Sequence, residues 1–486
     1  MSCTTLLVGK NASYDGSTLI ARNDDSGASG FTPKKLVVIH PEDQKREYET
    51  VLSHLKIELP DDPMKYTAMP NALKGKGIWA ASGINEAEVA MTATETITSN
   101  PRVLGADPLV EYDEETNTPG GIGEEDIVYL VLPYIHSAKE GVLRLGSLLE
   151  KYGTYEMNGI AFSDHEEIWW LETIGGHHWI AKRVPDDAYV VMPNQQGIDI
   201  FDLEDAYTTK KEHLCSDDLK EFIEKNHLSL NLDDKFNARY AFGSHDDSDH
   251  VYNTPRDWFI RRYFNPRTYK WDGINADYRP QSDDIPWTMV PEKKITIEDV
   301  KYALSTHFQH TPLDPYASHG DLSMKGAYRP VGINRNDFVS IMQLRQEQEP
   351  VEWIAFASNV FNALIPFYTH IDKTPEYLNN TTNDVSTDNF YWSSRLIAAM
   401  ADASYKQSSI HIERYQRNVL SKAHHLINIY DDLLKNETDD AKKTVLRHEA
   451  NDKLAEMLKK ETSETLHLVL DELSAIMKNK YARSDA

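Results

Sequence analysis

The residues best suited to chemistry stand near the beginning of the sequence. Cys3 is followed by a polar group that contains Arg22, Asp24 and Asp25. A thiolate is a strong nucleophile, but a free thiol needs a base that removes its proton. An arginine and two carboxylates beside a thiol can hold and polarise it. The combination indicates a nucleophilic cysteine with supporting charges close by.

Two short strands would bring these residues together. Residues 4–8 are apolar and β-branched and indicate a buried strand, and residues 18–21 indicate a second one. Asp15 and Gly16 between them form a turn signal. The resulting hairpin would return the polar group at residues 22–25 to the side of Cys3.

No neighbouring motif supplies the base for Cys3. The Cys-Gly and Cys-x-x-Cys signatures of conventional cysteine proteases and redox sites are missing from its surroundings. One solution is that the mature chain begins at Cys3, so that the α-amino group, with an ordinary pKa of about 7.7–8.0, acts as the base. This requires removal of Met1 and Ser2. The alternative is that Cys3 is a small apolar residue in a strand, because free cysteine is often buried.

Composition indicates a globular protein that does not bind nucleic acid. The sequence has 486 residues, 40% of them hydrophobic, and 51 Lys and Arg against 77 Asp and Glu give a net charge of −26. Nucleic-acid binding needs basic surface, so nucleic acid is not an expected partner. Two cysteines indicate a reducing compartment. With no 18-residue apolar run and no signal-peptide pattern, we expect a cytoplasmic protein without a membrane partner.

Strand and helix patterns follow one another in blocks. Amphipathic patterns predict helices at 138–152 and 254–264, and a charged helical region from about residue 385 to the end. Residues 157–194 carry four strand patterns separated by turn signals, which predicts one antiparallel sheet. The order of these blocks predicts an α+β fold in which helices cover packed antiparallel sheets.

Two other features invite a functional interpretation but have a plainer one. His177 and His178 could suggest a metal site, but adjacent residues of a strand point to opposite faces and no further ligand completes a set. Cys215, beside Ser216 at a predicted helix start, is interpreted as structural. We therefore expect no metal and no cofactor.

Several strings of residues carry a resemblance that covers essentially the whole chain. They are residues 2–5, 14–17, 20–26, 91–97, 121–126, 169–179, 252–256 and 385–392. With these strings the chain resembles the bacterial dipeptidase A family, which are cysteine peptidases of the N-terminal-nucleophile hydrolase superfamily. More distantly it is similar to penicillin V acylases, bile salt hydrolases and secernins.

The resemblance implies a fold. It predicts a four-layer αββα sandwich of the N-terminal-nucleophile hydrolase type with additional C-terminal helices. We expect a single domain over residues 1–486, with the sandwich and its insertions in 1–384. The mainly helical part, 385–486, would pack on that core.

The resemblance also implies residue roles. Cys3 would be the nucleophile and its freed amine the base, with Arg22 and Asp25 holding the thiol and the amine. Asn194 would donate a hydrogen bond to the oxyanion, and Arg256 would be a distal active-site arginine. In plainer interpretations Asn194 caps a turn and Arg256 begins a surface helix.

Glu95 departs from the pattern of the acylase relatives, which carry an oxyanion-hole asparagine at this point. An ionised glutamate cannot donate a hydrogen bond to an oxyanion. We therefore expect Glu95 to bind the α-ammonium group of a dipeptide substrate.

The implied activity is hydrolysis of a broad range of dipeptides through an acyl-enzyme, without a cofactor, by a protein expected to form a homo-oligomer. One alternative is an amidase with the same nucleophile that acts on penicillin V or conjugated bile salts. Another is a secernin-like protein that keeps Cys3 and the polar group beside it but is not catalytic. The segment 105–125 is the candidate loop that restricts the site to dipeptides.

Overall fold

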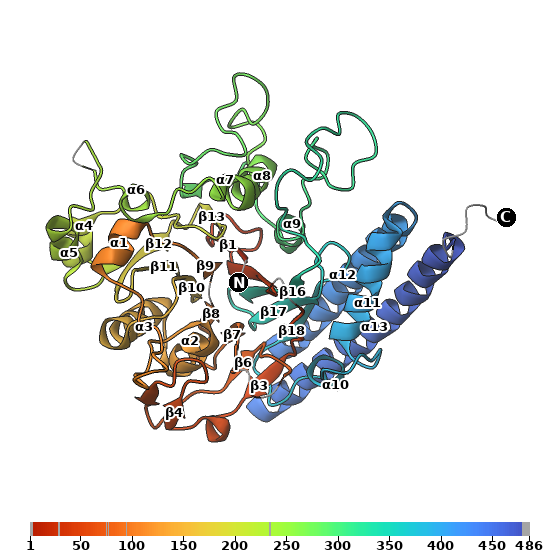
Figure 1. Ribbon diagram of the computed structural model, residues 1–486. Coiled ribbons are helices and arrows are strands. Elements are labelled where there is room, and N and C mark those ends of the chain that lie inside the picture. The colour runs from red at the N-terminus through yellow and green to blue at the C-terminus, as the bar shows by residue number, and fades with distance from the viewer. Residues whose placement is uncertain are drawn as a thin grey trace.

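The computed structural model describes residues 3–27, 30–73, 75, 77–93, 95–232 and 235–478. Met1 and Ser2, whose removal the sequence suggests, lie outside the described residues. Two large antiparallel sheets dominate the molecule (Figure 1). Two small strand pairs accompany them: β3 (Val37–Ile39) with β6 (Tyr66–Ala68), and β4 (Glu47–Glu49) with β5 (Lys56–Glu58).

The first large sheet contains the strand that follows Cys3. Its strands, in spatial order, are β15 (Thr288–Met289), β13 (Tyr189–Met192), β1 (Thr4–Val8), β2 (Thr18–Asp25), β16 (Asn336–Leu344), β17 (Val351–Phe356) and β18 (Ile365–Tyr368). The predicted hairpin is confirmed, because β1 pairs with β2 in a register that sets Thr5 opposite Arg22. Every residue of β1 and β2 is buried.

The second large sheet consists mostly of the middle of the chain. Its strands, in spatial order, are β14 (His213–Cys215), β12 (His178–Val184), β11 (Ile168–Ile174), β10 (Asn158–Ser163), β8 (Ala90–Thr92) and β7 (Ser82–Ile84), and β9 (Glu95–Thr96) also pairs with β10.

The prediction of one sheet over residues 157–194 is wrong at its last strand. Strands β10, β11 and β12 pair in sequence, but β13 leaves them and pairs with β1 in the other sheet, with Val8 opposite Tyr189. Turn signals fix where strands end, whereas the partner of a strand depends on contacts far along the chain. The crossing carries the segment after β13, with Asn194, to the sheet of Cys3.

The helices follow local sequence signals closely. They are α1 (Pro101–Ala106), α2 (Glu124–Val131), α3 (Ala138–Tyr152), α4 (Leu203–Tyr207), α5 (Leu219–Lys225), α6 (Ala238–Phe242), α7 (Asp249–Tyr252), α8 (Thr254–Phe264), α9 (Ile297–Ala303), α10 (Glu376–Asn379), α11 (Phe390–Ala403), α12 (Tyr405–Asn436) and α13 (Asp440–Ala475). Helix α3 has the predicted bounds, because the Ser137 side chain accepts a hydrogen bond from the Glu140 amide at its start and Gly153, at φ +69°, ends it.

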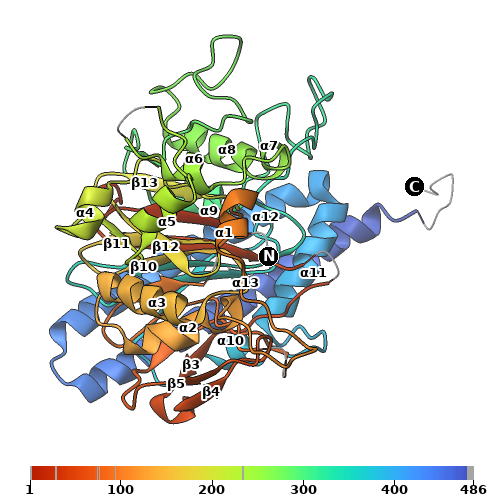
Figure 2. The same cartoon turned by 60° about the vertical axis from the view of Figure 1, so that its left-hand side comes forward.

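Three apolar cores fill the spaces between these layers. Between the two sheets, Leu7 and Ile20 of the first pack with Ala161 and Trp170 of the second. A second core joins the outer face of the second sheet to α2 and α3, which Figure 2 shows lying beyond its strands. The third joins the other face of the first sheet to α8, α9 and the C-terminal helices. The α+β prediction is confirmed in this coarse form: packed antiparallel sheets with helices against them.

The C-terminal helices cover an edge of the first sheet. Helices α11, α12 and α13 lie together beside β17 and β18 (Figure 1, blue). Asn451 of α13 donates from Nδ2 to the Tyr368 carbonyl at 3.0 Å and accepts from the Tyr368 amide at 2.9 Å. This pairing gives the edge strand β18 the partner that an open sheet edge lacks. Within the described part of the chain, no helix combines the length and the hydropathy needed to cross a bilayer.

Candidate functional site

Cys3 lies immediately before β1, and strand pairing decides which side chains surround it. Because Thr5 lies opposite Arg22, continuing the antiparallel register sets Cys3 opposite Asp24. Residues directly opposite each other share a face, so the side chains of Cys3, Thr5, Arg22 and Asp24 all point toward the second sheet. The thiol is fully buried, with Arg22 Nη2 donating to its Sγ at 3.0 Å. The Sγ itself lies 3.6 Å from Asp24 Oδ1.

The Arg22 guanidinium is held by acceptors from three parts of the chain. It donates to Asp24 Oδ1 at 3.0 Å and to Glu124 Oε1, at the first residue of α2, at 2.6 Å. Its other terminal nitrogen donates to the Ala81 carbonyl at 3.1 Å. Burial would lower the pKa of Arg22, but Cys3, Asp24 and Glu124 raise it well above its ordinary value. The group is therefore a fixed positive charge beside the sulfur.

Asp24 belongs to the polar group that the sequence places beside Cys3, but it was not among the residues predicted to have a catalytic role. Lys34 lies 3.3 Å from its Oδ2. Burial would raise the pKa of Asp24, but Lys34 and Arg22 outweigh it and hold the pKa below its ordinary value. The period of two along a strand could have identified Asp24, because it places residues 22 and 24 on one face.

Asp25, which was expected at the thiol, lies on the opposite face of β2. Its Oδ1 accepts from Asn23 Nδ2 at 2.8 Å and from Asn336 Nδ2 at 2.5 Å, and its Oδ2 pairs with Arg329. Burial raises the pKa of Asp25 despite the opposing charge of Arg329. The structure brings Arg22 to the sulfur and gives Asp25 a different set of partners.

The environment of the Cys3 thiol opposes its ionisation. Burial raises the pKa of the thiol well above its ordinary value. The positive charge of Arg22 lowers that pKa, but the carboxylates of Asp24, Glu95 and Glu124 raise it further. Cys3 in this state is a neutral thiol, so a reaction that uses it needs a base within reach.

Arg256 connects the beginning of β1 to Asn194. Its Nη1 donates to the Cys3 carbonyl at 2.5 Å and to Thr4 Oγ1 at 2.6 Å. Its Nη2 donates to Asn194 Oδ1 at 2.7 Å and to Asn253 Oδ1 at 2.8 Å. Arg256 is fully buried, so the interpretation as a surface helix residue is wrong. Burial and the nearby Arg329 lower the pKa of Arg256 to about 9.

Asn194 reaches the site because β13 crosses to the first sheet. Its Nδ2 donates to the Thr96 carbonyl at 3.0 Å, while its Oδ1 accepts from Arg256. Its own carbonyl accepts from Asn253 Nδ2 at 2.9 Å. These contacts fix the orientation of the carboxamide between β9 and α8.

Glu95, at the start of β9, is fully buried on the inner face of β1. Its Oε2 accepts from Thr5 Oγ1 at 2.9 Å, and its Oε1 has no hydrogen-bond partner among the described residues. Burial raises the pKa of Glu95 to about 8, although the positive charges of Arg256 and Arg22 oppose this. The carboxyl is therefore mostly protonated at neutral pH.

An open pocket of about 460 Å³ adjoins Asn194. Its lining includes Thr96, Thr98 and Asn194, together with residues from the segment 244–253. The segment 105–125 does not contribute to this lining, although its last residues include Glu124, the partner of Arg22. The segment 244–253 borders this pocket, and the role of the segment 105–125 in restricting the site to dipeptides stays a prediction.

The adjacent histidines 177 and 178 do not point to opposite faces as expected. His177 lies in the turn before β12, and the Nδ1 atoms of both rings meet the Asp107 carboxylate, His177 at 2.9 Å on Oδ1 and His178 at 2.7 Å on Oδ2. These are ordinary hydrogen-bond lengths, and Oδ2 also accepts from the backbone amides of His177 at 2.7 Å and His178 at 3.2 Å. Cys215 lies at the edge strand β14, half-buried, where burial raises its pKa to about 11.

Comparison with a family model and comparison with individual proteins point to the same family. A family model described as peptidase family C69 matches residues 2–418. The chain is 51% identical to a protein named dipeptidase from Bifidobacterium longum, over the full length of both. It is 50% identical to a probable dipeptidase A from Streptococcus pyogenes serotype M3, again over the full length of both. It is 43% identical to dipeptidase A from Lactobacillus helveticus, over 99% of this chain and 98% of that protein.

Proposed function

The chain belongs to peptidase family C69, and we propose that it is a dipeptidase in which Cys3 is the nucleophile. Full-length relatives at 43–51% identity bear the name dipeptidase, which supports the substrate class. The observation that carries the role of Cys3 is its fully buried thiol with Arg22 Nη2 at 3.0 Å. A cysteine buried only for its apolar character would not need a buried guanidinium beside its sulfur.

The α-amino group of Cys3 is the proposed base. Removal of Met1 and Ser2 would place this amine on the same residue as the thiol, and its ordinary pKa of about 7.7–8.0 suits proton transfer near neutral pH. Because burial raises the pKa of the thiol, deprotonation and attack are expected in one step. The amine accepts the thiol proton as sulfur bonds to the scissile carbonyl carbon.

The freed amine is proposed to be held by Asp25. A backbone nitrogen lies in the plane of a sheet, so carboxylates on either face of the neighbouring strand can approach it. Asp24 is already engaged with Arg22 and Lys34 on the thiol side. Asp25 approaches from the other face, and Arg22 and Asp24 are left to hold the sulfur.

Asn194 is the proposed oxyanion donor and Arg256 the residue that positions it. When the tetrahedral intermediate collapses, the carbon–nitrogen bond breaks and the protonated amine gives its proton to the leaving amino group. Water, activated by the same amine, then hydrolyses the thioester. Arg256 touches Asn194 Oδ1 and the Cys3 carbonyl, so it ties the donor to the nucleophile.

Glu95 is the proposed site for the substrate's α-ammonium group. Its buried Oε1 has no hydrogen-bond partner among the described residues. An ammonium ion nearby would favour the ionised carboxylate and offset the burial that raises its pKa to about 8. Glu95→Gln should therefore raise KM for free dipeptides and spare N-blocked substrates. Equal loss on both would contradict this role.

The proposal also includes a specific architecture for the fold. The two packed sheets with helices on their outer sides support a four-layer αββα sandwich of the N-terminal-nucleophile hydrolase type. We infer a single domain over residues 1–486, in which 385–486 packs on the core. Cytoplasmic location and a homo-oligomeric state stay predictions.

One experiment separates this function from its alternatives. The intact mass of the purified protein is measured, and hydrolysis is assayed on a dipeptide panel, penicillin V and glycine-conjugated bile salts. A chain that begins at Cys3 and cleaves only dipeptides supports the proposal. Preference for penicillin V or bile salts would indicate the amidase. A chain that keeps Ser2 and cleaves nothing would indicate a secernin-like protein.

A further inference from the structure

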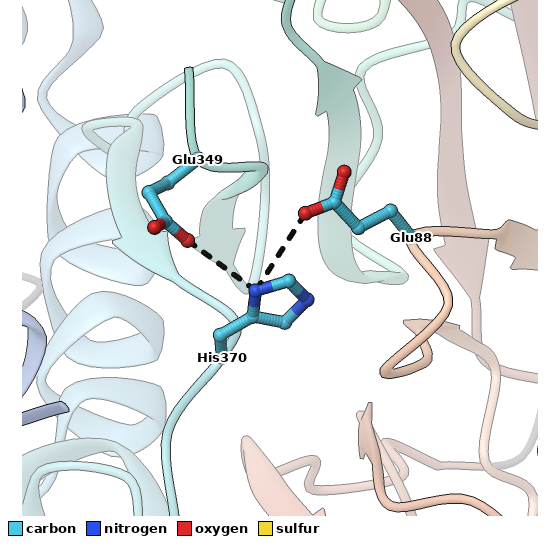
Figure 3. A group of neighbouring side chains, drawn as sticks. All are labelled: Glu88, Glu349 and His370. Atoms are coloured by element: carbon cyan, nitrogen blue, oxygen red, sulfur yellow. Dashed lines mark hydrogen bonds and ion pairs between the residues drawn. The ribbon is translucent and has the colours of Figure 1, made fainter. Parts of the chain in front are cut away.

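Four turns bring glutamate and histidine side chains together at the end of the sheets remote from Cys3. Glu88 lies in the β7–β8 turn, Glu349 lies in the β16–β17 turn, and His370 follows β18 (Figure 3). His165 lies in the β10–β11 turn. The Thr18 hydroxyl, at the far end of β2, donates to the Asp164 carbonyl at 2.7 Å. With a rise of about 3.3 Å per strand residue, this end lies roughly 20 Å from Asp24.

One ring nitrogen faces two carboxylates. His370 Nδ1 lies 3.3 Å from Glu349 Oε2 and 3.7 Å from Glu88 Oε1. Hydrogen bonds from nitrogen to oxygen are ordinarily about 2.9–3.0 Å long, and one N–H cannot point at two separate oxygens equally well. Tetrahedral coordination with metal–ligand bonds of about 2.0–2.1 Å separates neighbouring ligand atoms by about 3.3–3.4 Å. The 3.3 Å separation matches that of neighbouring ligands, and the three atoms all lie within 4.8 Å of one another.

The other oxygen of each carboxylate is already held by a cationic or polar partner. Arg447 Nη2 donates to Glu349 Oε1 at 2.8 Å, and His165 Nε2 contacts Glu88 Oε2. Such outer partners are what orient the ligands in metal sites.

The pair of histidines at Asp107 provides an internal contrast. There each Nδ1 takes its own carboxylate oxygen, at 2.9 and 2.7 Å. Hydrogen bonding accounts for that arrangement completely. In the Glu88 group, by contrast, His370 Nδ1 hydrogen-bonds to Glu349 Oε2 at 3.3 Å, and Glu88 Oε1 lies 3.7 Å from the same nitrogen, beyond hydrogen-bond distance.

We propose that Glu88 Oε1, Glu349 Oε2 and His370 Nδ1 bind one divalent transition-metal ion of the zinc type. Imidazole nitrogen and carboxylate oxygen are ligands that zinc accepts in protein sites. A cavity of about 510 Å³, lined by Glu88, Glu349, Asp431 and Lys443 among others, adjoins the group and gives water access to a fourth position.

The ion would act on stability and not on the chemistry of Cys3. Its ligands come from turns of both sheets, and Arg447 links Glu349 to α13. The site therefore fastens the turns of the two sheets and the C-terminal helices to one another. This departs from the expectation of no metal, which considered only His177 and His178.

The test is direct binding to the full-length protein after removal of metals with a chelator. Zinc is added, unbound ion is dialysed away, and bound zinc is measured by mass spectrometry. We expect one zinc ion per chain and a higher melting temperature. Glu349→Gln and His370→Gln should each weaken binding at least about tenfold, because the loss of an outer partner of a ligand alone costs about 10–100-fold. His136→Gln, an exposed histidine beside Glu140, is the matched control and should bind as the wild type does.

A second probe separates this site from zinc bound to thiols. Cobalt(II) bound by nitrogen and oxygen has visible bands but lacks the thiolate charge-transfer band that Cys3 or Cys215 would give. The wild-type protein should show the visible bands without the thiolate charge-transfer band. This readout uses the wild-type protein alone, so it does not depend on whether a variant folds. Failure to retain zinc or cobalt, a thiolate band, or undiminished binding in folded Glu349→Gln and His370→Gln would each overturn the proposal.

Discussion

The two faces of strand β2 carry adjacent carboxylates in opposite electrostatic states. On the inner face, Asp24 lies with Arg22 and Lys34, and its pKa is below the ordinary value. On the outer face, Asp25 lies with Arg329 and Asn336, and burial holds its pKa above the ordinary value. The side chains of the inner face contact the sulfur of Cys3, whereas those of the outer face lie around its backbone.

The difference shows how little adjacency in sequence means within a strand. Successive side chains of a strand point to opposite faces, so neighbours are separated by the thickness of the sheet. Both carboxylates are fully buried, and the cations that face them differ. Asp24 has two nearby cations, one of them beside the thiol, whereas Asp25 has Arg329 as its direct partner. Substitutions on the two faces should therefore have different effects on the reaction.

The largest effect is expected at the sulfur itself. Cys3→Ala removes the proposed nucleophile and should lower kcat on dipeptides by at least about a thousandfold. Cys215→Ala, at the edge strand β14, should leave kcat within about twofold, because surface or edge changes rarely affect chemistry. Steady-state hydrolysis with circular dichroism as the folding control measures both. Substantial activity in Cys3→Ala would dismiss the inner face as the catalytic one.

The next largest effect is expected from Asp24→Asn. The change removes a charge that positions Arg22 and leaves Lys34 without its carboxylate partner, so the sulfur loses its fixed neighbour. We expect kcat to fall by about tenfold to a hundredfold, toward the low end of what a positioned proton-transfer group contributes. A change in KM alone, with kcat preserved, would argue that Asp24 does not act on the nucleophile.

Asp25→Asn should change the pH profile more than the maximal rate. A carboxylate near the freed amine raises the pKa of that amine, so its loss should move the acid limb of kcat/KM to lower pH by about one unit. Asp24→Asn is the matched control and should leave this limb in place. If both variants move the acid limb equally, the inner face does not serve the thiol alone and the outer face does not serve the amine alone.

The smallest effect is expected on stability, through the proton that Glu95 retains on the inner face. Burial raises its pKa to about 8 in the folded protein from an unfolded value near 4.5. A raised pKa contributes stability that is fully present below pH 4.5 and is lost as the pH rises through 8. The free energy of unfolding should fall between these values with a slope of at most about 1.4 kcal/mol per pH unit from this group.

Glu95→Gln should flatten that slope. Denaturant unfolding at several pH values measures it. Asp126, whose pKa burial and Glu125 also raise to about 8, and Glu156, at about 7, contribute slopes of the same sign and remain in the variant. An unchanged slope in Glu95→Gln would mean that Glu95 is ionised in the folded protein at neutral pH.

Local signals were enough for elements whose ends are set by their own residues. Helix α3 is bounded by Ser137 and Gly153, and the β1–β2 hairpin by the turn at Asp15 and Gly16, so both were predicted correctly. Helix α8 also has the predicted bounds. Caps and turns act over a few residues, and the sequence states them directly.

Non-local pairing was beyond the reach of these signals. Nothing near β13 indicates that it pairs with β1 instead of β12, because a strand pattern does not name its partner. The face occupied by Asp24 follows only once the β1–β2 register is known. The group of Glu88, Glu349 and His370 is assembled from separate turns, which no spacing in the sequence reveals.

By itself the sequence indicated a cysteine beside Arg22 as the candidate nucleophile, an α+β fold and the family resemblance, because these depend on residue types and short-range patterns. The tertiary structure decided that Asp24 and not Asp25 lies at the sulfur, that Arg256 reaches the Cys3 carbonyl, and that Glu95 is buried as a mostly protonated carboxyl. Each of these depends on which faces meet and how much water they exclude, and long-range packing alone fixes both.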